Sequence, residues 1–411
     1  MQLRGGGSAL PGLVVEKINP HFLRNALETL PKGVVVVTGT NGKTTTTKII
    51  VQLLRAQGLR VFTNPSGSNF TRGIVASLLS HVDENGMLDA DIAVLELDEA
   101  HAVHFVRALK PRYTLVLNIL RDQLDRFGEI DHTAKLLEEV VEKTTDVVIL
   151  NRDDELVNGL SKKVAKNTLL NYFGVSADLK DSFPSDAELR STPQKKSSAP
   201  RLRQSDTVLS ELDGNQATFT FGRKKFGSTS LKLGGIYNVL NATAALAVVR
   251  AVCGDTIDSS LLLQEISTVK PAFGRGEAIE INGEPLEIVL VKNPSGFRLS
   301  LTSYAHQPAA TMIAINDLYA DGRDMSWLWD VDFEVFRKTG VPFVSGIRAY
   351  DMALRLQYDE VEVGKIIPDV AQATQRFLEE TSGPRRIYCT YTAMLALRRA
   401  LAKNYTVEPI E

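Results

Sequence analysis

The segment Val34–Lys48, VVVVTGTNGKTTTTK, decides the fold. It runs from four valines through a turn with two glycines to Lys43 and a row of threonines. A buried strand, a glycine-bearing turn and a helix start, in this order, form a loop whose backbone N–H groups hold phosphates. Val37 stands where the GxxxxGK[ST] pattern has its first glycine, so the spacing is a variant. A plain strand-to-helix loop is the alternative, but strand, turn and helix all agree on a nucleotide site.

Short apolar runs alternate with helical patterns from about Gly33 onward. The runs are GVVVVTG, LRVFT, DIAVLELD, RYTLVLN and DVVILN, and the helical pattern KIIVQLLRAQG follows the first of them. This alternation predicts βαβ units and a mostly parallel sheet in an α/β fold. Because nearly every residue of these runs is apolar, we expect helices on both faces of the sheet.

The chain has 411 residues, more than one hydrophobic core usually organises. We place a domain boundary near residue 268, so that residues 1–268 carry the loop and residues 269–411 form a second α/β domain. Within the first domain, a Ser-, Pro- and Lys-rich stretch at about 174–206 predicts an exposed, partly disordered insertion. The alternating pattern QATFTFGRKKFGSTSLKL predicts a hairpin that closes the insertion.

Composition sets the broad class. The formal net charge is -2, with 44% hydrophobic and 23% charged residues, which is typical of a soluble globular protein and indicates no nucleic-acid partner. The two cysteines, Cys253 and Cys389, lie far apart without CxxC spacing, so we expect no zinc site and a reducing cytoplasm. We find no signal peptide and no run of transmembrane length, so any membrane contact should come through a substrate or a partner.

Two further segments carry groups suited to cations and phosphates. VLELDEAH places Glu96 at the end of a buried strand with Asp98 and Glu99 beside it, and three carboxylates there are costly unless a cation is near. The alternative is that Asp98 or Glu99 caps the following helix, and we expect one of them to do so. NPSGSNFTRG, at Asn64–Gly73, offers hydroxyls, amides and Arg72 to phosphates or substrate, although Arg72 alternatively forms a surface salt bridge.

The pattern TGTNGKTT resembles the Mur ligase family, which includes the cell-wall amino-acid ligases and folylpolyglutamate synthetase. The other motifs follow in the family's order: NPSGSNFTRG, VLELDEAH, LNILRDQLDRFGEIDHTAK, LNRDDE, GGIYNVLN and FGRGE. The resemblance implies use of ATP and Mg²⁺, with Lys43 and Glu96 as catalytic residues and with Glu96 and Thr44, or alternatively its neighbour Thr45, as ligands of Mg²⁺. It implies nucleotide contacts from Gly39, Thr40, Asn41, Gly42, Lys43, Thr44, Thr45, Asn238 and Arg275. Substrate contacts are expected from Asn69, Thr71 and Arg72.

The family resemblance also has departures. Gln123 stands where other Mur ligases have a metal-binding His, although Asp122 and Asp125 remain beside it. Lys135 falls near the lysine that several members carbamylate, but a lone helical lysine is more often solvated. Asn238 either lies against the nucleotide base, as in the family, or caps a helix, or does both.

The second domain carries VLVKNPSGF, NDLYADGRDMSWLWD and YTAML, which resemble the MurT branch of this family, the MurT subunits of lipid II isoglutaminyl synthases. One short segment holds four acids and both tryptophans, Trp327 and Trp329. We interpret it as a substrate or partner surface, and the alternative is an acidic loop whose tryptophans anchor it to the core. We predict that Asp321 and Trp327 bind substrate.

The MurT resemblance implies that ATP phosphorylates the α-carboxylate of D-glutamate in the lipid II stem peptide and that ammonia then gives D-isoglutamine. A separate glutaminase, a GatD-like subunit in a heterodimer, would supply ammonia, with Asp324, or second Asp321, completing its Cys–His pair. The complex would act at the inner face of the cytoplasmic membrane. Many MurT proteins have a four-cysteine zinc ribbon, whereas the insertion here has no cysteine. The alternatives are a Mur-type amino-acid ligase without a glutaminase and a non-catalytic nucleotide-binding scaffold.

Overall fold

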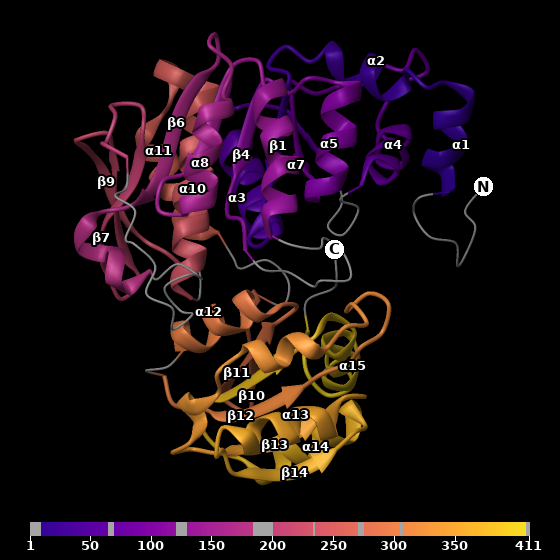
Figure 1. Cartoon of the computed structure of the whole chain (residues 1–411), viewed down its shortest axis with the longest axis vertical. Helices are drawn as coiled ribbons and strands as arrows, with labels where there is room; N and C mark the ends of the chain where they lie inside the picture. Colours follow the sequence, from indigo (N-terminus) through magenta and orange to yellow (C-terminus); the bar gives the residue numbers. More distant parts are fainter. Residues whose placement is uncertain are drawn as a thin grey trace.

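The computed structural model describes residues 10–64, 70–120, 130–183, 200–232, 235–269, 275–304 and 307–407. Its elements form two α/β bodies, drawn one above the other in Figure 1. The upper body holds a nine-stranded sheet and the lower body a six-stranded sheet. The predicted α/β class with mostly parallel sheets is confirmed.

The first sheet has the strand order β2-β3-β1-β4-β5-β6-β7-β8-β9. Strands β1 to β7 pair in parallel, and β7, β8 and β9 are antiparallel. The strands are β1 (Val34–Thr38), β2 (Val61–Thr63), β3 (Ile92–Glu96), β4 (Tyr113–Val116), β5 (Val147–Asn151), β6 (Leu169–Val175), β7 (Thr207–Asp213), β8 (Gln216–Phe221) and β9 (Lys224–Ser230).

Helices cover both faces of this sheet, as the uniformly apolar strands predict. Side chains alternate between the two faces of a strand. In β1, Val35 and Val37 therefore enter one core with α3 and α10, while Val34 and Val36 enter another with α2, α4 and α5. The helices are α1 (Leu10–Ile18), α2 (Phe22–Glu28), α3 (Lys43–Ala56), α4 (Thr71–Leu79), α5 (Glu99–Ala108), α7 (Ile130–Lys143), α8 (Glu155–Gly159), α10 (Ile236–Cys253) and α11 (Ser259–Thr268).

Helix α10 departs from one expectation. The stretch Ile236–Thr256 is long and apolar enough to cross a membrane by length and composition, which corrects the statement that no run reaches that length. Fifty-six per cent of its apolar window is buried, and α10 packs against α3 and β6. These contacts make α10 a core helix of the first body.

The predicted insertion begins later than residue 174. Strand β6 extends to Val175, and a 3₁₀ turn follows at Ala177–Ser182, so only residues 184–199 of the insertion lie outside the described part of the chain. The predicted hairpin is confirmed as the antiparallel pair β8–β9. Other 3₁₀ turns occupy Leu160–Lys163 and Gly254–Thr256.

The second sheet has the order β10-β11-β15-β12-β13-β14, in which only the β10–β11 pair is antiparallel. One face is covered by α12, α13 and two 3₁₀ turns, and the other by α14 and α15. The elements are β10 (Arg275–Ile281), β11 (Glu284–Leu290), α12 (Pro294–Tyr304), β12 (Ala310–Ala314), turns at Ser326–Asp330 and Glu334–Phe336, β13 (Val341–Ser345), α13 (Ala349–Tyr358), β14 (Val363–Ile367), α14 (Val370–Glu380), β15 (Arg385–Cys389) and α15 (Tyr391–Leu401).

Candidate nucleotide site

The loop between β1 and α3 forms the floor of a cavity. Gly42 precedes α3 with φ +88°, a backbone conformation that glycine adopts without steric cost. A Cβ atom on Gly42 would lie 2.5 Å from Oδ1 of Asn241 on α10. The loop therefore requires glycine here both for its backbone angle and for its close approach to α10.

Asn118, just beyond β4, holds this loop from one side. Its Oδ1 accepts a hydrogen bond from the backbone N–H of Asn41 at 2.8 Å, and its Nδ2 donates to the carbonyl oxygen of Asn41 at 2.9 Å. The Thr40 N–H donates to the Asn118 carbonyl at 3.1 Å. Because β1 and β4 are neighbours in the sheet, these bonds fix the loop against the strand end.

Lys43 is the first residue of α3, and its side chain curls back into the loop. Its Nζ donates to the carbonyls of Gly39 at 2.5 Å and Thr40 at 3.2 Å. The Glu99 carboxylate lies 3.8 Å away, and both side chains are almost fully buried. Burial raises the pKa of the Glu99 carboxyl, the charge of Asp98 raises it further, and the Lys43 ammonium opposes this rise. Asp98 caps α5 by accepting a bond from Ala100 N–H at 3.4 Å, which confirms the predicted cap.

Thr44 and Glu96 come together across the ends of α3 and β3. The Thr44 hydroxyl donates to Oε1 of Glu96 at 3.0 Å. Asn64 fixes the Glu96 backbone by donating to its carbonyl at 3.1 Å and accepting from its N–H at 3.0 Å. The buried Thr45 hydroxyl beside them has no hydrogen-bond partner among the described residues. A hydroxyl and a carboxylate are hard oxygen ligands, so this pair suits Mg²⁺.

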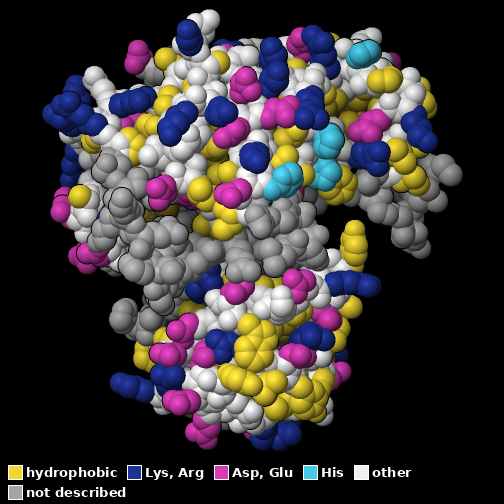
Figure 2. Space-filling view, viewed as in Figure 1, with side chains coloured by type: hydrophobic (Ala, Val, Ile, Leu, Met, Phe, Trp, Pro, Cys, Tyr) yellow, Lys and Arg dark blue, Asp and Glu magenta, His cyan; other side chains and the backbone are white. Residues whose placement is uncertain are grey.

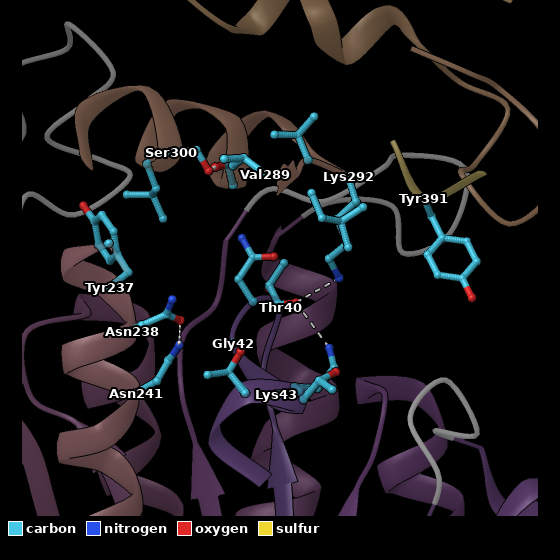
Figure 3. Close-up of a pocket in the computed structure, with 18 of the residues that line it drawn as sticks. Thr40, Gly42, Lys43, Tyr237, Asn238, Asn241, Val289, Lys292, Ser300 and Tyr391 are labelled. Carbon is cyan, nitrogen blue, oxygen red and sulfur yellow. Dashed lines mark hydrogen bonds between the residues drawn. The ribbon is translucent and has the colours of Figure 1, made fainter. Parts of the chain in front are cut away.

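The N-terminal turn of α10 forms a second wall, which carries Tyr237, Asn238 and Asn241 (Figure 3). Asn241 donates from Nδ2 to Oδ1 of Asn238 at 3.3 Å. The backbone N–H of Asn238 donates to the Gly235 carbonyl at 3.1 Å. Both asparagines line the cavity that the loop lines, so the structure brings Asn238 together with the predicted phosphate loop.

The second body closes the cavity from the opposite side. Its α12 and the residues just after β11 face the loop (Figure 3), and the cavity volume is about 330 Å³, within the range of small-molecule sites. The amides of Asn41 and Asn293 bond reciprocally at 3.3 and 3.1 Å, and Lys292 Nζ donates to the Thr40 carbonyl at 3.3 Å. The cavity is therefore assembled from two bodies that are far apart in the sequence.

Tyr304, at the end of α12, also lines this cavity. Burial raises the pKa of its phenol to about 12, so the hydroxyl stays protonated near neutral pH and remains a hydrogen-bond donor. The guanidinium of Arg386 lies 4.2 Å from the ring centroid, a cation–π contact that positions the ring. The sequence interpretation missed Lys292, Asn293 and Tyr304. The available signal was the polar pair in VLVKNPSG, at the point where an apolar strand meets a helix.

Four predicted site residues lie elsewhere or are only partly described. Thr71 begins α4 with a buried hydroxyl. Arg72 forms a half-exposed ion pair with Glu16 of α1 at 3.0 Å, which was the alternative for this residue. Arg275 begins β10, but its side chain is outside the described part. Asn69 lies outside the described residues altogether.

Gln123 and its two flanking acids, Asp122 and Asp125, also lie outside the described residues. Lys135 is described, and it is exposed on α7. Its exposed position agrees with the solvated alternative.

The acidic, Trp-bearing segment divides between core and surface. Trp327 is buried with 4% exposure in the core of the second body, edge-on to Phe297, which corrects the expectation that it contacts substrate. Asp321 is buried and lines the cavity, but both its oxygens accept hydrogen bonds, including the Thr392 N–H at 2.7 Å and hydroxyl at 2.5 Å. Asp324 is half-buried and accepts from the Ser326 N–H at 2.9 Å.

Replacing Gly42 with Ala should abolish ATP binding, because the new Cβ meets Asn241 and the backbone strain costs about 1–2 kcal/mol. Gly58→Ala is the matched control, since Gly58 has φ +84° with no atom within 4 Å of the added Cβ. Calorimetric titration with ATP is the measurement. Equal ATP affinity in the two variants would contradict this placement of the site.

Comparisons with known proteins agree with this architecture. The Mur ligase middle domain matches residues 37–249, and the MurT ligase C-terminal domain matches residues 290–394. The solved MurF ligase of Thermotoga maritima in complex with ADP superposes with TM-score 0.67 at 19% identity, covering 94% of this chain and 83% of that one. At this identity the likeness shows the fold.

Curated relatives match over nearly the whole chain. The lipid II isoglutaminyl synthase (glutamine-hydrolyzing) subunit MurT of Streptococcus pneumoniae is 32% identical over 98% of this chain and 94% of its own length. The subunit of the same name from Staphylococcus aureus is 30% identical over 91% of this chain and 88% of its own length. On these matches and on the geometry of the two-body cavity, the chain belongs to the Mur ligase family, among the MurT subunits of lipid II isoglutaminyl synthases.

Proposed function

We propose that this chain is the synthase subunit that amidates the α-carboxylate of D-glutamate in the lipid II stem peptide. The single observation that carries the proposal is the cavity in which Lys43, Thr44 and Glu96 of one body face Lys292 and Asp321 of the other. The printed names of the relatives supply the substrate and the nitrogen source for those proteins. The cavity supports the same reaction here.

The reaction proceeds in two steps. A carboxylate oxygen of the substrate attacks the γ-phosphorus of ATP, the bond from that phosphorus to the ADP oxygen breaks, and an acyl phosphate forms. The nitrogen of ammonia then attacks the acyl carbon, inorganic phosphate leaves, and nitrogen loses a proton to give the amide. Lys43 and the loop N–H groups stabilise negative charge on the phosphates, and the wall from the second body excludes water from the acyl phosphate.

The oxygens of Thr44 and Glu96 would hold Mg²⁺ in this site, with Asn64 keeping the Glu96 backbone in place. When bound, the ion would supply positive charge that offsets the negative charge developing on the phosphates during transfer. The cost of burying Glu96, which has 7% exposure, fits a cation ligand.

We propose that a partner subunit supplies the ammonia. The whole sequence has two cysteines, and both are buried: Cys253 ends α10 and Cys389 ends β15. Burial also raises the pKa of the Cys253 thiol, which disfavours the nucleophilic thiolate. Neither cysteine has the exposed setting that a glutaminase nucleophile requires, so the proposal includes a separate glutaminase subunit.

The second body offers a surface for that subunit. On α13, Tyr350, Leu354 and Tyr358 recur at helical spacing and are between 48% and 69% exposed. Trp329, half exposed, stacks edge-on against Tyr358 at 5.0 Å. Figure 2 shows hydrophobic side chains gathered on this face of the lower body. We name Trp329, Tyr350, Leu354 and Tyr358 the α13 face.

The occupant we propose for the α13 face is the glutaminase subunit. Aromatic side chains at such density are typical of protein interfaces. The chain from Tyr319 to Trp329 contains Asp324, so an acid proposed to complete the partner's Cys–His pair lies in a segment that ends at this face. The complex would act at the inner face of the cytoplasmic membrane, where lipid II presents its stem peptide.

The amidation itself is tested by incubating the purified chain with lipid II, Mg-ATP and ammonium. Phosphate release should depend on lipid II, and mass spectrometry should show a loss of about one mass unit as a hydroxyl becomes an amide. Lys43→Ala should lower the rate by about 100-fold or more, because it removes a cation from the transferring phosphoryl group. Absence of lipid-dependent turnover with either ammonium or glutamine plus a glutaminase subunit would reject the proposal. ATP binding without such turnover would favour a nucleotide-binding scaffold.

Asp324→Asn should separate the two nitrogen sources. The asparagine oxygen can still accept from Ser326 N–H, so the loop keeps its hydrogen bond. Turnover with ammonium should stay near the wild-type rate, while turnover with glutamine and the glutaminase subunit should fall by about 100-fold. If both rates are unchanged, Asp324 has no role in glutamine hydrolysis.

Tyr350→Glu combined with Tyr358→Glu should prevent assembly with the glutaminase subunit, because charges would be buried in an apolar interface. Leu169→Glu is the matched control, since Leu169 is 66% exposed, as is Tyr350, but lies on β6 of the other body. Light scattering after size-exclusion chromatography reports the complex mass. A persisting heterodimer in the double variant would reject the α13 face. Binding to lipid vesicles is measured on the same double variant. If the variant keeps the heterodimer but no longer binds vesicles, the α13 face contacts the membrane.

A further inference from the structure

A buried arginine on α13 holds the acidic, Trp-bearing segment of the second body. Nε of Arg355 donates to the carbonyl of Leu328 at 3.2 Å, and its Nη2 donates to the carbonyl of Val331 at 2.6 Å. Its Nη1 donates to Oδ1 of Asp359, the C-cap residue of α13, at 2.5 Å. Because a guanidinium donates in fixed directions, it holds the two carbonyls in a set position relative to α13.

The same guanidinium lies against two aromatic rings. Its Cζ is 5.4 Å from the ring centroid of Trp329 and 5.5 Å from that of Phe333, which are cation–π distances. Oδ2 of Asp359 accepts from the Phe333 N–H at 2.7 Å, so the carboxylate that binds Arg355 also holds the chain just after the turn. Trp329 is half exposed and belongs to the α13 face. Arg355 therefore sets the orientation of a ring in that face.

A second buried arginine holds the segment from α12. Nη1 of Arg298 donates to the carbonyl of Asp330. The preceding residue, Phe297, packs its ring edge-on against Phe333 with the centroids 5.1 Å apart. Figure 1 shows α12 at the boundary with the upper body, and other residues of this helix line the nucleotide cavity. The segment is thus held between two helices by one buried guanidinium from each.

Asp324 is attached to the turn that these arginines hold. The turn spans Ser326–Asp330, and its Ser326 N–H donates to Oδ1 of Asp324 at 2.9 Å. The Leu328 N–H donates to the Met325 carbonyl at 3.1 Å, which ties the residue after Asp324 to the same turn. A displacement of the turn would therefore displace the Asp324 carboxylate with it.

We infer that Arg355, together with Arg298, is a positioning residue for glutamine hydrolysis by the partner subunit. It holds the turn so that Asp324 meets the partner's Cys–His pair in one orientation. An acid in such a triad works by holding its histidine in the correct tautomer and orientation, so its own position matters. Arg355 acts through the turn and touches none of the reacting atoms. The inference deepens the proposed function, and it rests on the proposed role of Asp324.

The test uses Arg355→Lys, which keeps a positive charge beside Asp359 but loses the fork that reaches both carbonyls. The chain is assayed with excess glutaminase subunit, and light scattering confirms that the heterodimer forms. Release of glutamate from glutamine should fall by about 10- to 100-fold, the cost of a misplacement near 1 Å. ATP affinity by calorimetry and amidation of lipid II with ammonium should both stay near the wild-type values.

Arg376→Lys is the matched control for the loss of a guanidinium. Arg376 pairs with Glu380 four residues later at 2.6 Å, as Arg355 pairs with Asp359, but it lies on α14 at the other face of the sheet. Glutamate release should be unchanged in this variant. Arg298→Gln is the second variant on the turn, and it should lower glutamate release as Arg355→Lys does, because it removes the bond to the Asp330 carbonyl from α12.

A double variant separates positioning from a general weakening of the fold. In the Asp324→Asn background, Arg355→Lys should lower glutamate release no further, because two changes that act through one group are not additive. Additive losses in the double variant, unchanged glutamate release in both arginine variants, or an equal fall in ATP affinity would overturn the inference. Glutamate release requires no lipid II. A heterodimer with Arg355-dependent glutamate release but no amidation of lipid II would therefore reject the proposed function and leave this inference standing.

Discussion

The paired hydrogen bonds between the Asn118 side chain and the backbone of Asn41 are the constraint on which the site depends. A loop that binds phosphates must keep its N–H groups directed outward even when no phosphate is present. The Asn118 amide bonds one N–H and one carbonyl of the loop at once. The loop is thereby fixed through Asn41, and its other N–H groups are not used by the Asn118 amide. Since Asn118 follows β4, the geometry of the loop is fixed by the pairing of β1 with β4.

The strand order extends this constraint to the metal ligands. β1 lies between β3 and β4, so its carboxyl end has Glu96 on one side and Asn118 on the other. In open parallel sheets, ligands bind outside the carboxyl ends of the strands. The sheet thus places a carboxylate, a phosphate loop and an amide clamp at one edge, although they lie more than twenty residues apart in the chain.

Much of this half of the site follows from local sequence. Four valines, two glycines and a lysine specify strand, turn and helix, and Asp98 before an alanine-bearing helix specifies a cap. β6 was not predicted. Its last two residues, Gly174 and Val175, fall within the stretch that the sequence assigns to the polar insertion. The sequence also did not indicate which of Trp327 and Trp329 is buried and which is exposed. Only the 3₁₀ turn at Ser326–Asp330 determines that one ring enters the core and the other faces solvent.

The part of the cavity wall that the second body contributes could not be predicted from local sequence, for a different reason. Lys292 and Asn293 belong to the site because they contact residues 252 positions earlier in the chain, and no periodic pattern in the sequence predicts such a contact. Both contacts cross between the two bodies, and so does the second amide bond of the Asn41–Asn293 pair. Together they hold the start of α12 over the phosphate loop, so that the second body limits the access of water to the cavity.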